Sequence, residues 1–207
     1  MPCNKDMTEA VKRQVIYESL AAVGQEIAAL NIHPNLWVID GGGTPENTVI
    51  DFAANSQRIC GIESVCMFGR GWKTYRPTSK YKNVIGEQCH KVIENRMRQW
   101  ILFNADYWRE IAQKGWTGSP GAPGSCSLPA GKHDDFIQQI CREQLRGKDD
   151  VGGKTVWVWD TAPGPHDFGD CMTMAYVGAV LRGIGTAGQQ VRIPRNQHKR
   201  RVTYVGV

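Results

Sequence analysis

The stretch LWVIDGGG at residues 36–43 decides the fold class. A short apolar run that ends in an acidic residue and glycines is typical of a strand buried on both faces and followed by a turn. Thr44 and Pro45 then predict the start of a helix that continues to about Gln57. The next apolar run, 62–68, completes a strand–helix–strand unit. Because such units pair their strands in parallel through a right-handed crossover, the sequence predicts an α/β fold.

Apolar residues at helical spacing predict a first helix from Thr8 to Leu30, with Thr8 as its N-cap. Apolar spacing and turn residues also predict the remaining elements. We predict helices over 90–97, 105–114, 132–145 and about 165–183, a loop over 115–131, a turn over 148–153 and a strand over 156–159.

Composition places the chain among ordinary globular proteins. Of its 207 residues, 41% are hydrophobic and 22% are charged. It has no apolar run near the ~20 residues that span a bilayer, and the segment up to Asp6 lacks the apolar core of a signal peptide. The seven cysteines form no CxxC pair, which argues against a zinc ribbon. We therefore expect reduced thiols in a cytosolic protein.

The positive charge of the chain, a net +5, is unevenly placed. No acidic residue follows Leu181, so we divide the chain into a domain over 1–183 and a basic tail over 184–207. A basic tail can bind the phosphates of DNA, and a solvated terminus of the same composition is the alternative. The candidate DNA contacts in the tail are Arg195, Lys199, Arg200 and Arg201.

A second basic segment, 69–84, follows the second predicted strand. Its candidate phosphate contacts are Arg70, Lys73 and Arg76. Aromatic residues lie between these cations at Trp72, Tyr75 and Tyr81. Aromatic side chains among cations can contact nucleic acid, or they can attach the loop to the core.

Asp40 stands where ligands bind in α/β proteins. It follows a predicted parallel strand, and the carboxyl ends of such strands form the ligand-binding edge of an open sheet. The glycines after it would let a phosphate backbone approach closely. The alternative is an aspartate that only starts the turn or caps the next helix.

Two further carboxylates, Asp167 and Asp170, lie three residues apart at the start of the last predicted helix and so share one face. With Asp40 they could hold Mg²⁺ or Mn²⁺, which prefer oxygen ligands. Stabilisation by the helix dipole is the structural alternative. The chain has no GxxxxGK[ST] or GxSxG motif, which argues against an ATPase and a serine hydrolase.

Several segments, in this order, resemble the large terminase subunits of tailed phages of the lambda-like class. WVIDGGG at 37–43 with TVIDF at 48–52 resembles a family strand that ends in Asp-Ser/Thr-Gly-Gly and leads into a helix. FGRG at 68–71 stands where the family has a strand ending in Lys-Gly. HDFGDC at 166–171 with MAY at 174–176 is similar to the family's closing acidic motif.

The resemblance implies an RNase H-like nuclease domain that cuts concatemeric double-stranded viral DNA with two divalent cations, Mg²⁺ or Mn²⁺. It places Asp40, Asp167 and Asp170 at catalytic, metal-binding positions. It also implies as partners the terminase ATPase domain, the small terminase subunit and the portal, in the cytoplasm of an infected bacterium.

The sequence departs from the family in two respects. The family strands that precede the first helix, one of which carries the first metal-binding Asp, have no counterpart before Thr8, and neither has the ATPase motor, so we expect a truncated sheet. Arg70 replaces the usual Lys. The leading hypothesis is therefore an endonuclease domain, provided that the first Asp is supplied. The alternative is a DNA-binding or packaging-assembly fragment without nuclease activity. A third interpretation, a resolvase or transposase, fits the closing motif less well.

Overall fold

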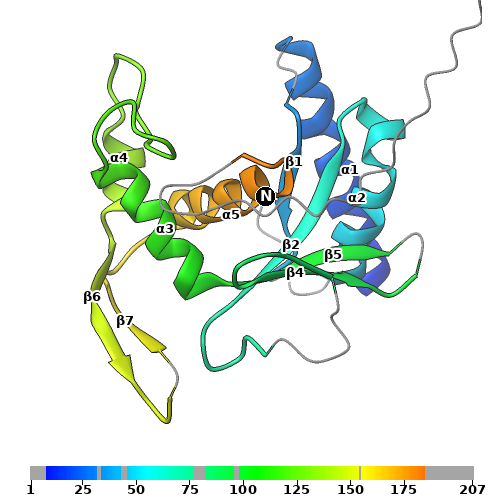
Figure 1. Ribbon diagram of the computed structural model, residues 1–207. Coiled ribbons are helices and arrows are strands. Elements are labelled where there is room, and N and C mark those ends of the chain that lie inside the picture. Colours follow the sequence, from blue (N-terminus) through cyan, green and yellow to red (C-terminus); the bar gives the residue numbers. More distant parts are fainter. Residues whose placement is uncertain are drawn as a thin grey trace, which may run out of the picture.

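A five-stranded mixed sheet with helices on both faces forms the centre of the protein in the computed structural model (Figure 1). The structure describes residues 8–31, 34–42, 46–76, 83–95, 98–153 and 155–184. Its elements are α1 (Glu9–Ala29), β1 (Trp37–Asp40), α2 (Glu46–Cys60), β2 (Ser64–Arg70), β3 (Asn83–Gly86), β4 (Cys89–Ile93), β5 (Gln99–Asn104), α3 (Ala105–Thr117), α4 (Asp134–Ile140), β6 (Glu143–Asp150), β7 (Thr155–Thr161) and α5 (Asp167–Leu181).

The strand–helix–strand prediction is confirmed. β1 and β2 pair in parallel, with Trp37 opposite Ser64 and Asp40 opposite Met67. The sheet has the order β1-β2-β5-β4-β3, in which β5 continues the parallel part, β4 runs antiparallel to β5, and β3 runs antiparallel to β4. The α/β class is therefore correct, whereas the RNase H-like topology stays a prediction.

One face of the sheet is covered by α1 and α2 (Figure 1). Thr8 caps α1 as predicted, because its hydroxyl accepts a hydrogen bond from the N–H of Val11 at 3.4 Å. The core on this side centres on Phe52, which is 0% exposed. Tyr17 and Trp37 pack edge-on against its ring, with centroids 5.4 and 5.7 Å away.

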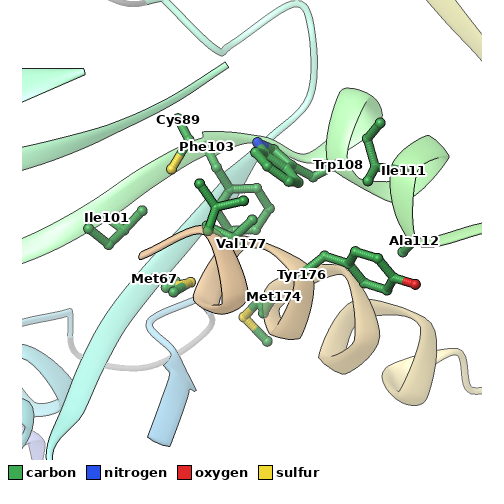
Figure 2. Packing of buried hydrophobic residues seen from close by; sticks show 11 residues of the cluster. Met67, Cys89, Ile101, Phe103, Trp108, Ile111, Ala112, Met174, Tyr176 and Val177 are labelled. Carbon is green, nitrogen blue, oxygen red and sulfur yellow. The ribbon is translucent and has the colours of Figure 1, made fainter. Parts of the chain in front are cut away.

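The opposite face is covered by α5 and α3, and it contains the larger core (Figure 2). Val177 of α5 lies in the middle of this cluster at 0% exposed, with Phe103 and Ile101 of β5 nearby. Trp108 brings α3 into the same cluster and is also 0% exposed. The packing fixes the second half of α5 against the sheet, whereas its first turn lies against α4, where the ring of Phe168 meets that of Phe136.

The predicted helix over 90–97 is wrong. Residues Cys89–Ile93 form β4, which pairs antiparallel with β5. His90 and Cys89 are 2% and 1% exposed, so long-range pairing and burial override the local helical pattern. Neither β5 nor β3, the other partner of β4, was predicted.

The predicted helix over 132–145 is correct only in its first half. Helix α4 ends at Ile140, and residues 143–150 form β6 of a separate two-stranded sheet with β7. The turn between β6 and β7 contains Gly152 and Gly153, at φ +61° and +74°. Glycine suits this left-handed conformation, and strand pairing extends further into the predicted turn than the sequence suggested.

Strand β1 lies at the edge of the sheet, since among the described strands it pairs only with β2. Helices nevertheless lie against both of its faces, but only Ile39 is buried and Trp37 and Val38 are half-buried, so the predicted burial on both faces is met only in part. On the α5 side, a Cβ atom at Gly178 would lie 2.8 Å from a methyl group of Val38. The glycine thus allows the helix to approach the strand closely.

We expect Gly115→Ala to destabilise the fold by about 2 kcal/mol, as for other overpacked cores. A Cβ atom at this buried position of α3 would lie 1.6 Å from the hydroxyl of Tyr176 and 2.9 Å from the carbonyl oxygen of Gly124. That hydroxyl donates to the same carbonyl at 2.8 Å, so it cannot move without breaking a hydrogen bond. Urea unfolding measures the effect. Gly147→Ala, where no atom lies within 4 Å, is the control, and equal effects of the two would refute the prediction.

No helix among the described residues is long and apolar enough to cross a membrane.

Candidate functional site

Three parallel strands bring polar residues to one edge of the sheet. Asp40 ends β1, Arg70 ends β2 and Asn104 ends β5. Because carboxyl ends of parallel strands lie side by side, this is the edge that the sequence analysis selected for Asp40. Helix α3 begins directly after β5, and its Asp106 adds a buried carboxylate, 8% exposed.

Asp40 is exposed at this edge. Its Oδ1 accepts a hydrogen bond from the backbone N–H of Gly42 at 2.9 Å. The aspartate therefore does start a turn, as its structural alternative supposed. A carboxylate with one such bond retains free acceptor positions, so this role does not exclude ligand binding.

The other two predicted carboxylates, Asp167 and Asp170, lie in the first turn of α5. His166 precedes them without capping the helix through its side chain, and its Nε2 lies 3.9 Å from Oδ2 of Asp170. Carboxylates at this position are stabilised by the N-terminal end of the helix dipole.

All three predicted carboxylates act on the thiol of Cys171. Partial desolvation, followed by the negative charges of Asp170, Asp167 and Asp40, raises the pKa of this thiol. Cys171 also borders one pocket with Trp37 and Val38 of β1, so the first turns of α5 approach the strand that Asp40 ends.

Arg109 of α3 joins several of the acidic side chains, and the sequence analysis missed it. Its Nη2 donates to Oδ1 of Asp170 at 3.0 Å, and its Nε lies 2.9 Å from a carboxylate oxygen of Glu143. A carboxylate oxygen of Asp106 lies 4.0 Å from Nη1. The guanidinium carbon lies 5.4 Å from the ring centroid of Trp159. A cation in this place offsets the repulsion between the carboxylates.

Glu143, the first residue of β6, is the second member of the site that sequence reasoning missed. It is 6% exposed, and burial raises its pKa in spite of the opposing charge of Arg109. The negative charges of Asp170 and Asp106 add to this rise. No local motif marks either residue, because the contacts of Arg109 with Glu143 and Asp170 join positions at least 34 residues apart.

The donor chemistry of Asp40, Asp167 and Asp170 fits Mg²⁺ or Mn²⁺, since all three offer carboxylate oxygens. Within the part of the chain that the structure describes, however, no three His, Cys, Asp or Glu side chains gather closely enough to hold a metal ion. The described residues therefore fit a metal site in chemical type, but they do not complete one.

Of the predicted DNA contacts, Arg70, Lys73 and Arg76 lie at or after the end of β2. The guanidinium carbon of Arg70 lies 5.8 Å from the ring centroid of Phe68. Lys73 and Arg76 are exposed on the following segment. Four other predicted DNA contacts lie outside the described residues: Arg195, Lys199, Arg200 and Arg201. The aromatic Tyr81 and the predicted helix start at Thr44 and Pro45 also lie outside the described residues.

The basic segment is attached to the protein at two points. The backbone N–H of Trp72 donates to Oδ2 of Asp106 at 2.7 Å. The buried Tyr75 hydroxyl lies 3.0 Å from Nδ1 of His90, with which it forms a hydrogen bond. Tyr75 thus attaches the loop to the sheet. The sequence analysis left this role open for the aromatic residues of the segment, beside contact with nucleic acid.

A cleft of about 1030 Å³ separates this segment from the β6–β7 hairpin, with part of α3 along its wall. Its aromatic and cationic lining comprises Trp72, Lys73, Tyr75, Arg76, Tyr107, Lys148 and Trp157. Tyr107 lies only two positions from Arg109, so α3 contributes to both the cleft and the carboxylate cluster.

Glu110 anchors the hairpin to α3 beneath this cleft. It is 6% exposed and accepts from Nε1 of Trp157 at 2.7 Å, and its carboxylate oxygens lie 2.7 and 2.8 Å from the ammonium groups of Lys148 and Lys114. Burial alone would raise the pKa of this carboxyl group. The three donors outweigh burial and lower its pKa to about 2.

Comparison with protein families gives a match to the terminase large subunit gpA endonuclease domain over residues 6–190. No curated protein and no solved structure matches the chain. The match spans most of the 207 residues and includes Asp40, Asp167 and Asp170. The chain therefore belongs to the family of terminase large subunit gpA endonuclease domains.

Proposed function

We propose that this domain cleaves double-stranded viral DNA during packaging and that Asp40, Asp167 and Asp170 hold its divalent cations. The observation that carries the proposal is that Asp40 ends β1 at the carboxyl edge of the parallel strands, and that the first turns of α5 approach the same strand at Cys171. That edge is the usual ligand site of an open α/β sheet. Family membership supports the endonuclease class.

The proposed cofactors are two Mg²⁺ or Mn²⁺ ions, which supply Lewis-acid stabilisation of the charge on a phosphodiester. The protein's own residues have separate tasks. Arg109 orients Asp170 through their 3.0 Å hydrogen bond. Arg70, Lys73 and Arg76 hold DNA phosphates beside the site. Arg195, Lys199, Arg200 and Arg201 extend the proposed DNA contacts into the tail.

Plasmid cleavage tests the proposal directly. We expect the protein to nick or linearise plasmid DNA with Mn²⁺ and not with EDTA, and Asp40→Ala to remove the activity. Asp51→Ala is a control of the same residue type, since Asp51 lies on α2 in an ion pair with Arg98. Cleavage that survives Asp40→Ala would contradict the assignment.

A second candidate function is favoured by the incomplete metal site. With no three suitable ligands together among the described residues, the chain could serve as a DNA-binding or packaging-assembly fragment. Its proposed partners are then double-stranded DNA, the terminase ATPase domain, the small terminase subunit and the portal, in the host cytoplasm. A melting temperature that Mn²⁺ leaves unchanged, together with DNA binding without cleavage, would favour this candidate.

A further inference from the structure

The cleft between the basic segment and the β6–β7 hairpin has the charge and size of a site for a polyanionic chain. Its volume, about 1030 Å³, reaches the upper end of the ~300–1,000 Å³ typical of small-ligand pockets. Lys73 and Arg76 bring two exposed cations to its lining, and Lys148 adds a third, which pairs with the buried Glu110 at 2.7 Å. Of the described residues that line the cleft, Glu87 alone is acidic.

Cations and aromatic rings are paired within this cleft. The ammonium nitrogen of Lys73 lies 5.5 Å from the ring centroid of Trp72. That of Lys148 lies 5.7 Å from the ring centroid of Trp157. In each pair the ammonium group lies over a face of the ring, so the cleft brings together a phosphate-binding group and an aromatic ring, which match the phosphate and the base of a nucleotide.

Both tryptophans come from anchored positions. The indole N–H of Trp157 donates to the buried Glu110, and the ring of Tyr107 meets that of Trp157 at 90°, with centroids 6.2 Å apart. The backbone of Trp72 is held by Asp106 at 2.7 Å. Anchoring lowers the ordering cost that a ligand would otherwise have to overcome.

We propose that this cleft binds an unpaired DNA strand, with bases stacked on Trp72 and Trp157 and phosphates on Lys73, Arg76 and Lys148. The choice of DNA rests on the proposed function. An unpaired strand is required because a duplex keeps its base faces inside its own stack, where a tryptophan cannot reach them. Helix α3 borders this cleft through Tyr107 and contacts Asp170 through Arg109.

Binding of an oligothymidylate, compared with a duplex of equal length, tests the proposal by fluorescence anisotropy. We expect Trp72→Ala to weaken binding of the unpaired strand by roughly tenfold to a hundredfold. Trp72→Phe should retain most of the affinity, because it keeps an aromatic face. Trp72 is preferred to Trp157 as the test position, since Trp157 also anchors the hairpin.

Salt dependence tests the phosphate contacts separately. Lys73→Ala should reduce the magnitude of the slope of log K against log salt concentration by about 0.7, the value for one phosphate of a single strand. Lys132→Ala is the matched control, because Lys132 is exposed and is not part of the cleft lining. Equal effects of the two lysine variants, or unchanged oligothymidylate binding by Trp72→Ala, would overturn the proposal.

Plasmid cleavage by the same preparations separates this inference from the proposed function. If binding of the unpaired DNA strand depends on Trp72 but the protein cuts no DNA, the proposed binding site in the cleft is supported and the proposed nuclease function is refuted. If the protein cuts DNA but its binding of the unpaired strand does not depend on Trp72, the proposed binding site in the cleft is refuted and the proposed nuclease function is not affected.

Discussion

Asp170→Asn is expected to lower metal-dependent DNA cleavage by about 100-fold or more, which corresponds to the loss of one preorganised charge in an active site. Asparagine keeps the size of the side chain but removes the negative charge that a divalent cation needs. It also weakens the contact with Arg109, which lies 3.0 Å from Oδ1 of Asp170. The measurement is the initial rate of plasmid nicking with Mn²⁺.

The matched control for this variant is Asp160→Asn. Asp160 also accepts a hydrogen bond from an arginine, Arg146, but it lies on β7 of the hairpin. Neutralising it should leave the nicking rate within a factor of about two, as expected for an exposed ion pair worth less than ~1 kcal/mol. Equal losses in both variants would show that Asp170 has no special role.

Thermal unfolding provides a second readout for the same pair of variants. A ligand that binds only the folded protein stabilises it by about 2.7 kcal/mol at 100 times its dissociation constant. We expect Mn²⁺ to raise the melting temperature of the starting protein and of Asp160→Asn, and to have little effect on Asp170→Asn. An equal rise in all three proteins would place the cation elsewhere.

The second large effect concerns Glu110, whose replacement by glutamine should destabilise the protein at neutral pH by up to about 3 kcal/mol. The folded protein lowers the pKa of this carboxyl group from 4.5 to about 2, and each pKa unit corresponds to about 1.4 kcal/mol. Because the pKa in the folded state is depressed, this stabilisation is fully present above about pH 4.5. It is lost as the pH falls toward 2.

Urea unfolding at pH 7 and at successively lower pH values measures this effect. The difference between Glu110→Gln and the starting protein should shrink below about pH 4.5 and vanish near pH 2. The control is Glu94→Gln: Glu94 lies 3.8 Å from Arg98, and its side chain is 52% exposed. We expect a change below ~1 kcal/mol for this control at every pH. A cost for Glu110→Gln that does not depend on pH would show that the side chain acts through packing and not through its charge.

Local sequence patterns predicted the elements whose stability comes from nearby residues. The apolar spacing and the Thr8 cap of α1 are both present, and so are the β1–α2–β2 unit and most of α3 and α5. Such segments can be predicted because burial of a strand or of one helix face leaves a repeating apolar pattern in the chain. The same patterns placed Asp40, Asp167 and Asp170 at the ends of elements, where the structure finds them.

Patterns failed where distant pairing decides the conformation. The His90 region was predicted as a helix, yet β4 is held between β3 and β5, and its partner residues on β5 come from 99–103. Residues Glu143–Asp150 likewise adopt a strand only because β7 pairs with them. The sequence of a short apolar segment does not show which strand will pair with it. Local patterns therefore cannot tell whether such a segment forms a helix or a strand.

The sequence by itself thus determined the fold class, the family resemblance and the three candidate carboxylates. Only the tertiary structure decided what surrounds them: Arg109 between Asp170 and Glu143, and the aromatic, basic cleft beside α3. The physical reason is that helix and strand periodicity depends on neighbouring residues, whereas an ion pair or a cleft depends on side chains that folding brings together. Arg109 and Asp170 are 61 positions apart, and no spacing rule connects them.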